Sequence, residues 1–72
     1  MDYEYRTKLG ANIRACRKSQ GLSQDKLGLM IGISCGKSYI SRIELGKCGI
    51  SVDVLYRLAE ALGVKASDLL EF

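Results

Sequence analysis

The residues best able to do chemistry lie between positions 24 and 47, and they are cations and hydrogen-bond donors rather than nucleophiles. Lysine and arginine donate to phosphate oxygens and to the acceptor edge of guanine, while amides and hydroxyls can bond to bases or to the backbone of a nucleic acid. Such side chains are suited to binding a polyanion rather than to catalysing a reaction. The set comprises Gln24, Lys37, Ser38, Tyr39, Ser41, Arg42 and Lys47.

Catalysis and metal binding have little support in the sequence. It contains no histidine, no paired carboxylates in an apolar setting and no glycine-rich phosphate loop, so we expect no enzyme. Cys16, Cys35 and Cys48 stand apart, without a C-x-x-C pair, so we expect free thiols and neither metal nor cofactor. Cys16 is expected as a small core residue.

Positive charge is concentrated in the same part of the chain. Residues 6–47 carry a net charge of +7, whereas residues 1–5 and residues 48–72 each carry −2. A basic segment attracts a polyanionic partner. The alternative is a solvated basic face without a function, and charge alone does not exclude it.

Two short helices must position these residues. The first runs from about Gln24 to Ile31, with Ser23 as N-cap and Gly32 as the left-handed stop. The second begins near Lys37 and ends before Gly46. Their apolar residues point inwards and leave the polar set with no core to enter, an arrangement that suits insertion into a DNA major groove. The inward residues are Leu27, Ile31, Ile40 and Ile43.

This stretch resembles the helix-turn-helix of the Cro/C1 repressor-like, or XRE-type, family, and the resemblance covers nearly the whole chain. It rests on Leu22-Ser23-Gln24, Leu27, Gly32-Ile33-Ser34, the run Ser38-Tyr39-Ile40-Ser41-Arg42-Ile43-Glu44, and Gly46.

The resemblance implies DNA contacts and a structural ion pair. Gln24 would contact a phosphate, the outward face of the second helix would supply base and backbone contacts, and Arg17 would pair with Glu44. Apart from the resemblance, the position of Lys47 between two helices, with Gly49 and the backbone N–H groups before Ser51, predicts a contact with the DNA backbone beside the groove. A mobile loop lysine is nearly as good an interpretation. One departure is that Cys35 and Gly36 add two residues before the second helix. Either this helix begins late, near Lys37, or the turn bulges.

Three further helices complete the expected fold, at about residues 5–20, 52–62 and 66–70. The expected fold is an all-α, compact bundle of four to five short helices that forms one domain over residues 1–72. It resembles the lambda repressor-like DNA-binding domain, with its helix-turn-helix at about 23–45. Tyr5 and Val52 are expected on the inward faces of their helices. The expected core comprises Leu9, Ile13, Cys16, Leu22, Leu27, Ile31, Ile33, Ile40, Ile43, Leu55, Leu58, Ala59, Leu62 and Val64.

The apolar C-terminal segment, residues 64–72, is a candidate dimerisation segment. Leu69, Leu70 and Phe72 are expected to form a homodimer surface, since exposed apolar patches on small proteins mark partners. The alternative is that they fold back and cap the core.

The expected function is a sequence-specific regulator of transcription that binds double-stranded DNA, a repressor acting as a homodimer on a palindromic operator. The alternative is a protein-interaction module of the same fold, antitoxin-like or polymerase-binding. The N-terminus lacks the apolar stretch of a signal peptide and no run is long enough for a membrane span, so we expect a cytoplasmic protein. No small-molecule ligand is evident.

Overall fold

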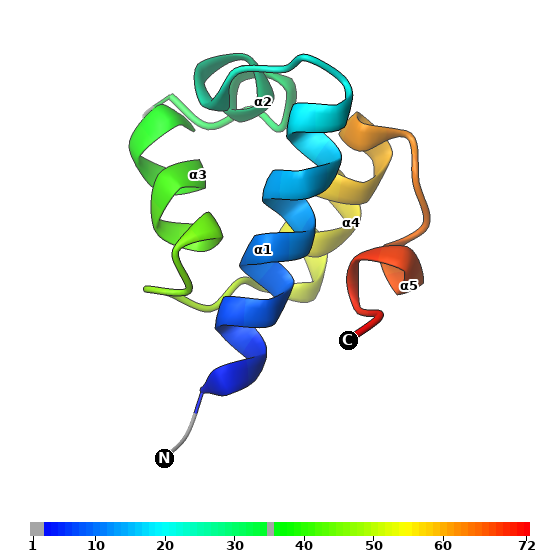
Figure 1. Ribbon diagram of the computed structural model, residues 1–72. Helices are drawn as coiled ribbons and strands as arrows, with labels where there is room; N and C mark the ends of the chain where they lie inside the picture. Colours follow the sequence, from blue (N-terminus) through cyan, green and yellow to red (C-terminus); the bar gives the residue numbers. More distant parts are fainter. Residues whose placement is uncertain (1–2, 35) are drawn as a thin grey trace.

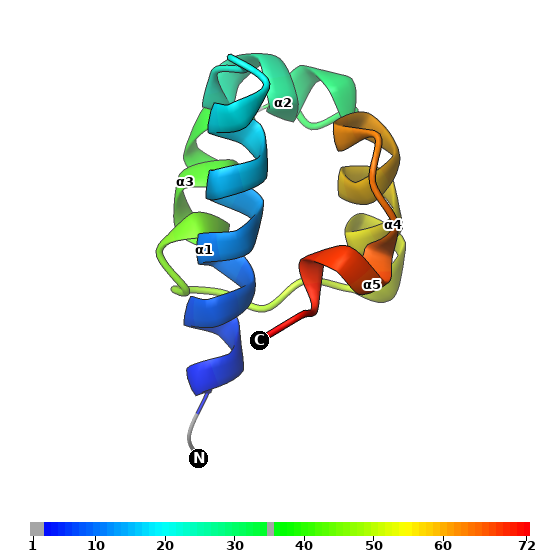
Figure 2. The same cartoon turned by 45° about the vertical axis from the view of Figure 1, so that its right-hand side comes forward.

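The computed structural model describes residues 3–34 and 36–72, and the regular structure of these residues is helical. The elements are α1 (Glu4–Ser19), α2 (Gln24–Met30), α3 (Gly36–Glu44), α4 (Val52–Leu62) and α5 (Ala66–Leu69). Helix α1 crosses the molecule, with α2 across one end, α3 on one side, and α4 and α5 on the other (Figures 1 and 2). The all-helical fold expected from the sequence is confirmed. In the described part of the chain, no helix combines the length and apolar character needed to cross a membrane.

Local signals start and stop the helices that form the helix-turn-helix. The Ser23 hydroxyl accepts a hydrogen bond from the Lys26 backbone N–H at 3.0 Å, as an N-cap should. Gly32 and Gly46 follow α2 and α3 with φ values of +80° and +73°, a conformation that side chains with a Cβ rarely adopt. The expected bounds of α2 and α3 therefore agree with the structure to within one residue at each end.

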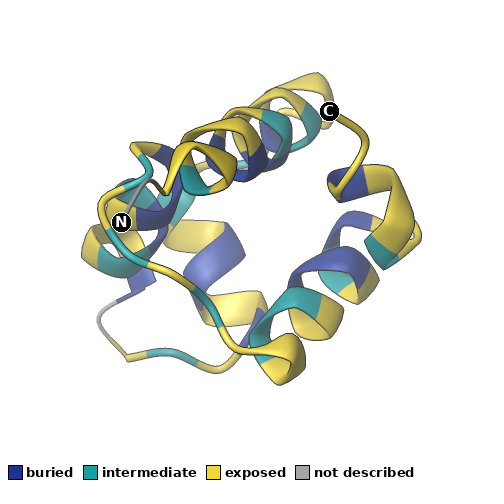
Figure 3. Cartoon of the chain, turned by 90° about the horizontal axis from the view of Figure 1, so that it is seen from below, coloured by how far each residue is buried: buried dark blue, intermediate teal, exposed yellow. Residues whose placement is uncertain are grey.

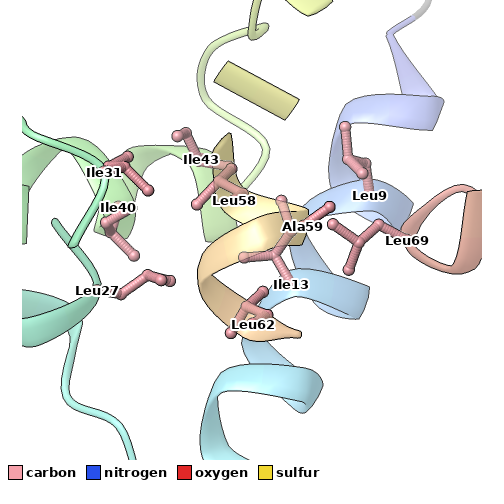
Figure 4. Close-up of a cluster of buried hydrophobic side chains, with 10 residues drawn as sticks. All are labelled: Leu9, Ile13, Leu27, Ile31, Ile40, Ile43, Leu58, Ala59, Leu62 and Leu69. Carbon is pink, nitrogen blue, oxygen red and sulfur yellow. The ribbon is translucent and has the colours of Figure 1, made fainter. Parts of the chain in front are cut away.

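Apolar side chains from all five helices meet in a single core (Figure 4). Cys16, Leu22, Ile33, Leu55 and Val64 are partly buried and pack against it, as expected. Helices α2 to α5 have 7, 9, 11 and 4 residues and are too short to be stable alone, so this shared core holds the domain together. The buried members of the core are Leu9, Ile13, Leu27, Ile31, Ile40, Ile43, Leu58, Ala59, Leu62 and Leu69.

The prediction that Leu69 lies on a dimer surface is wrong. Only 2% of this residue is exposed, because α5 folds back against α1 and α4 and inserts Leu69 into the core. The Asn12 side-chain amide fastens this end of the chain by donating to the carbonyl oxygens of Leu69 at 2.9 Å and Glu71 at 3.0 Å. Leu70 and Phe72 remain exposed.

Two residues expected on inward faces are also exposed. Tyr5 lies in the first turn of α1, which extends beyond the other helices (Figure 1), and contacts Tyr3 edge-on. Val52 is the first residue of α4 and is 68% exposed. Both residues have the expected helical spacing, but each lies in the first turn of its helix and stays exposed.

Glycine allows α2 and α3 to cross at close range. A Cβ added to Gly28 would lie 2.3 Å from the Gly36 Cα, so neither position leaves room for a side chain. Helix α3 begins at Gly36, one residue before the expected start. Gly36 is therefore part of the helix crossing rather than a spare turn residue, while Cys35 lies outside the described residues.

Candidate nucleic-acid interface

A buried ion pair joins the helices that frame the candidate interface. Arg17 Nε donates to Glu44 Oε2 at 2.7 Å and Arg17 Nη2 donates to Glu44 Oε1 at 3.1 Å, with both residues only 7% exposed. Arg17 Nη1 also donates to the Leu22 carbonyl at 2.7 Å. The hydrogen bond with Glu44 raises the pKa of Arg17 above its usual range. One guanidinium thus links α1, the segment before α2, and the end of α3.

Gln24 joins this network from the first position of α2. Its side-chain nitrogen donates to Glu44 Oε1 at 3.1 Å, and the residue is half-buried. One amide hydrogen is therefore used to hold α2 against α3, which leaves the second for an external acceptor. Sequence spacing gave no signal of this contact, because the two residues are 20 positions apart.

The outward face of α3 carries polar and cationic side chains. Lys37, Ser38 and Arg42 are exposed, and Ser41 is half-buried. Ile40 and Ile43 are buried on the opposite face of the same helix. Figure 3 shows this division along the helices, with buried segments towards the centre and exposed segments outside.

Tyr39 departs from the expected pattern. It was expected to have no core to enter, but it is half-buried and packs against the edge of the core. Burial raises the pKa of its hydroxyl, and the nearby Cys48 adds to the rise while Arg42 opposes it. The ring therefore anchors α3 as well as bordering its outer face.

Lys47 is placed by the turn that ends α3. Its backbone N–H donates to the Arg42 carbonyl at 2.9 Å, in the pattern that closes a helix at a left-handed residue. The left-handed residue is Gly46, where a Cβ would lie 2.7 Å from Thr7 Oγ1 on α1. The exposed Lys47 side chain thus lies just beyond the last turn of α3.

The cations of this face are not neutralised within the described residues. The ion pairs found there are Arg17 with Glu44 and Lys8 with Glu4. Lys37, Arg42 and Lys47 take part in neither pair. Their charges are available to an external anion.

The described residues hold no grouping suited to metal binding, since no three of their histidine, cysteine, aspartate or glutamate side chains lie close enough together. Cys16 and Cys48 are free thiols. The candidate binding site is therefore the positively charged outward surface of α3, which is held in place by the packed apolar core.

Comparison with known proteins agrees with this geometry. A helix-turn-helix family model matches residues 13–69. The control protein C.BamHI of Bacillus amyloliquefaciens is 36% identical over 73 residues, covering 100% of this chain and 88% of that protein. The HTH-type transcriptional regulator y4dJ of Sinorhizobium fredii is 35% identical over 66 residues, covering 92% of this chain and 83% of that protein.

A crystal structure of a related protein has a similar fold. The restriction-modification controller protein C.AhdI from Aeromonas hydrophila superposes with a TM-score of 0.86 and 31% sequence identity, over 93% of this chain and 98% of that one. The names of these relatives describe a control protein, a transcriptional regulator of the helix-turn-helix type and a restriction-modification controller protein. The chain belongs to the helix-turn-helix family of transcriptional regulators, of the XRE type.

Proposed function

We propose that this protein is a sequence-specific repressor that binds a palindromic operator as a homodimer. Helix α3 enters the major groove, where Arg42, Lys37, Ser38 and Ser41 meet base edges and phosphates. Gln24 and Lys47 hold the DNA backbone on either side of α3, and Tyr39 borders the groove.

The observation that carries this proposal is the contrast between the two faces of α3. One face is locked into the core by Ile40 and Ile43, while the other exposes Lys37 and Arg42 without carboxylate partners in the described part of the chain. The buried Arg17–Glu44 pair holds the end of α3 against α1, and the hydrogen bond from Gln24 to Glu44 holds α2 against α3. A rigid, cationic, outward helix supports insertion into a groove rather than binding of a small ligand.

Dimerisation is supported by apolar residues that remain uncovered after α5 has packed. Leu70 and Phe72 are 46% and 56% exposed at the C-terminal end. Symmetric dimers of this kind read two half-sites about 34–36 Å apart on one face of the duplex. We assign Leu70 and Phe72, without Leu69, to the dimer surface.

The biological setting that the relatives favour is control of a restriction–modification system. Two of the similar proteins are described as a control protein and a restriction-modification controller. Other small regulators of this family act as phage repressors or as antitoxin-type autoregulators. In each setting the protein acts in the cytoplasm, where its DNA lies.

Selection of bound duplexes from a random-sequence DNA pool tests the proposal directly. We expect an enriched palindrome with half-site centres about one helical turn apart, and a sedimenting species of two protein chains per duplex. Enrichment of an asymmetric single site would contradict the homodimer. No retention of any duplex at low salt would favour the protein-interaction alternative.

A further inference from the structure

A groove outside the helix-turn-helix runs between α1 and the end of α3. The α1 residues that line it are all exposed, and Leu45 forms the opposite wall beside Glu44. Thr7, Ala11, Arg14 and Lys18 lie at helical spacing along one stripe of α1. The α1 residues of the groove are Thr7, Ala11, Arg14, Ala15 and Lys18.

This groove continues the α3 surface. A second, adjoining groove is lined by Arg14 and Leu45 together with Gln24 and Ser41, two residues assigned above to DNA contact. Arg14 and Leu45 therefore border both grooves. A duplex that lies against Gln24 and Ser41 is next to Arg14.

The charges of the groove are available to an external anion. Glu44, the carboxylate beside it, already accepts hydrogen bonds from Arg17 and Gln24. Arg14 and Lys18 take no part in the ion pairs of the described residues. They are thus two exposed, unneutralised cations separated by one helical turn.

The shape of the groove suits a backbone rather than a base. Ala11 lies one turn before Ala15, and neither side chain extends beyond Cβ, so a partner can approach α1 closely beside Arg14 and Lys18. Leu45 is 58% exposed and offers an apolar side chain against which a sugar ring can pack. A deoxyribose–phosphate strand presents this combination of apolar sugar and spaced anions.

We propose that Arg14 and Lys18 bind phosphates of the operator flank, so that α1 forms a second backbone contact outside the groove that α3 reads. This inference rests on the proposed function. Phosphate contacts fix register and add affinity, but carry no sequence information directly. The contact should therefore strengthen binding to operator and random DNA alike.

The test compares two double variants by fluorescence anisotropy on the selected operator and on random duplex, over a range of salt concentrations. For Arg14→Ala with Lys18→Ala, we expect the slope of log affinity against log salt to become shallower by about 2, since each phosphate contact contributes about 0.9. Affinity for both duplexes should fall by a similar factor. Arg57→Ala with Lys65→Ala removes the same charge from α4 and the segment before α5, and should keep the wild-type slope.

A second variant adds a charge instead of removing one. Ala15→Glu places a carboxylate in the groove and should weaken binding to both duplexes, while Ser67→Glu on α5 should not. The inference is overturned, while the proposed function stands, if two results are found together. These are an Arg14/Lys18 double variant that keeps the wild-type slope of log affinity against log salt, and an Ala15→Glu variant that keeps the wild-type affinity. Failure of the wild-type protein to bind any duplex would instead overturn the proposed function, and the inference with it.

Discussion

At the residue scale, the Arg17–Glu44 pair decides how α3 is held. Two hydrogen bonds and near-complete burial place it among ion pairs whose disruption leaves an uncompensated charge in the core. Gln24 shares the same carboxylate, so the pair also orients the start of α2.

Replacing Glu44 by alanine should lower the free energy of unfolding by about 3–5 kcal/mol, because Arg17 would stay buried without its anion. Glu60→Ala removes an exposed glutamate of α4 and should change the free energy of unfolding by no more than about 0.5 kcal/mol. Urea unfolding followed by circular dichroism measures both. A loss below about 1 kcal/mol for Glu44→Ala would show that the pair behaves as an exposed one.

Tyr39 should make stability depend on alkaline pH. Burial raises the pKa of Tyr39 in the folded state above the value near 10 of an unfolded tyrosine, so the folded state disfavours the phenolate. The Tyr39 contribution is complete below about pH 10 and is lost as pH rises through the folded pKa. Tyr39→Phe should therefore lose less stability than the wild type on titration upwards from about pH 9. Parallel loss in the two proteins by urea unfolding would contradict this, and Tyr56→Phe controls for removal of a phenol.

At the element scale, the α2–α3 crossing depends on a glycine on each helix. Gly28→Ala would place its Cβ 2.3 Å from the Gly36 Cα, which is backbone and cannot swing aside. We expect a loss of about 1–3 kcal/mol in the free energy of unfolding, with weaker operator binding because α3 is displaced. Leu29→Ala, on the exposed neighbouring residue, is the matched control for stability. Wild-type thermal unfolding of Gly28→Ala would show that the helices can separate without cost.

The helices could be predicted from the sequence, whereas several contacts between them could not. Caps such as Ser23 and stops such as Gly32 act within a few residues, so they can be read locally. The Gly28–Gly36 crossing, the Gln24–Glu44 hydrogen bond and the burial of Tyr39 depend on how helices pack, and periodicity carries no information about that. The arginine–glutamate pairing came from the family resemblance, not from spacing.

At the scale of the whole molecule, neighbouring apolar residues of the C-terminal segment have different roles, one in the core and the others in the proposed dimer surface. Leu69 belongs to the core, whereas Leu70 and Phe72 remain outside it. The sequence could not distinguish these neighbours, because all three are apolar and the return of α5 is set by tertiary contacts such as those of Asn12.

Substitutions at these neighbours should therefore have different effects. Leu69→Ala should lower the free energy of unfolding by about 2–5 kcal/mol, as for other buried leucines. Leu70→Ala combined with Phe72→Ala should leave the secondary structure intact and weaken self-association, measured by analytical ultracentrifugation. An unchanged dimer in the second variant would place the dimer surface elsewhere.

The central claim is that α3 reads DNA sequence from its cationic outward face, with Arg42 at the centre of that reading. The most direct measurement is the ratio of affinities for the selected operator and for random duplex, in the wild type and in Arg42→Ala at one fixed salt concentration. We expect the wild type to prefer the operator by roughly a thousandfold or more. In Arg42→Ala, discrimination should fall by roughly 1–3 kcal/mol, with the fold intact. Equal affinity of the wild type for both duplexes, or an unchanged ratio in Arg42→Ala, would contradict the claim.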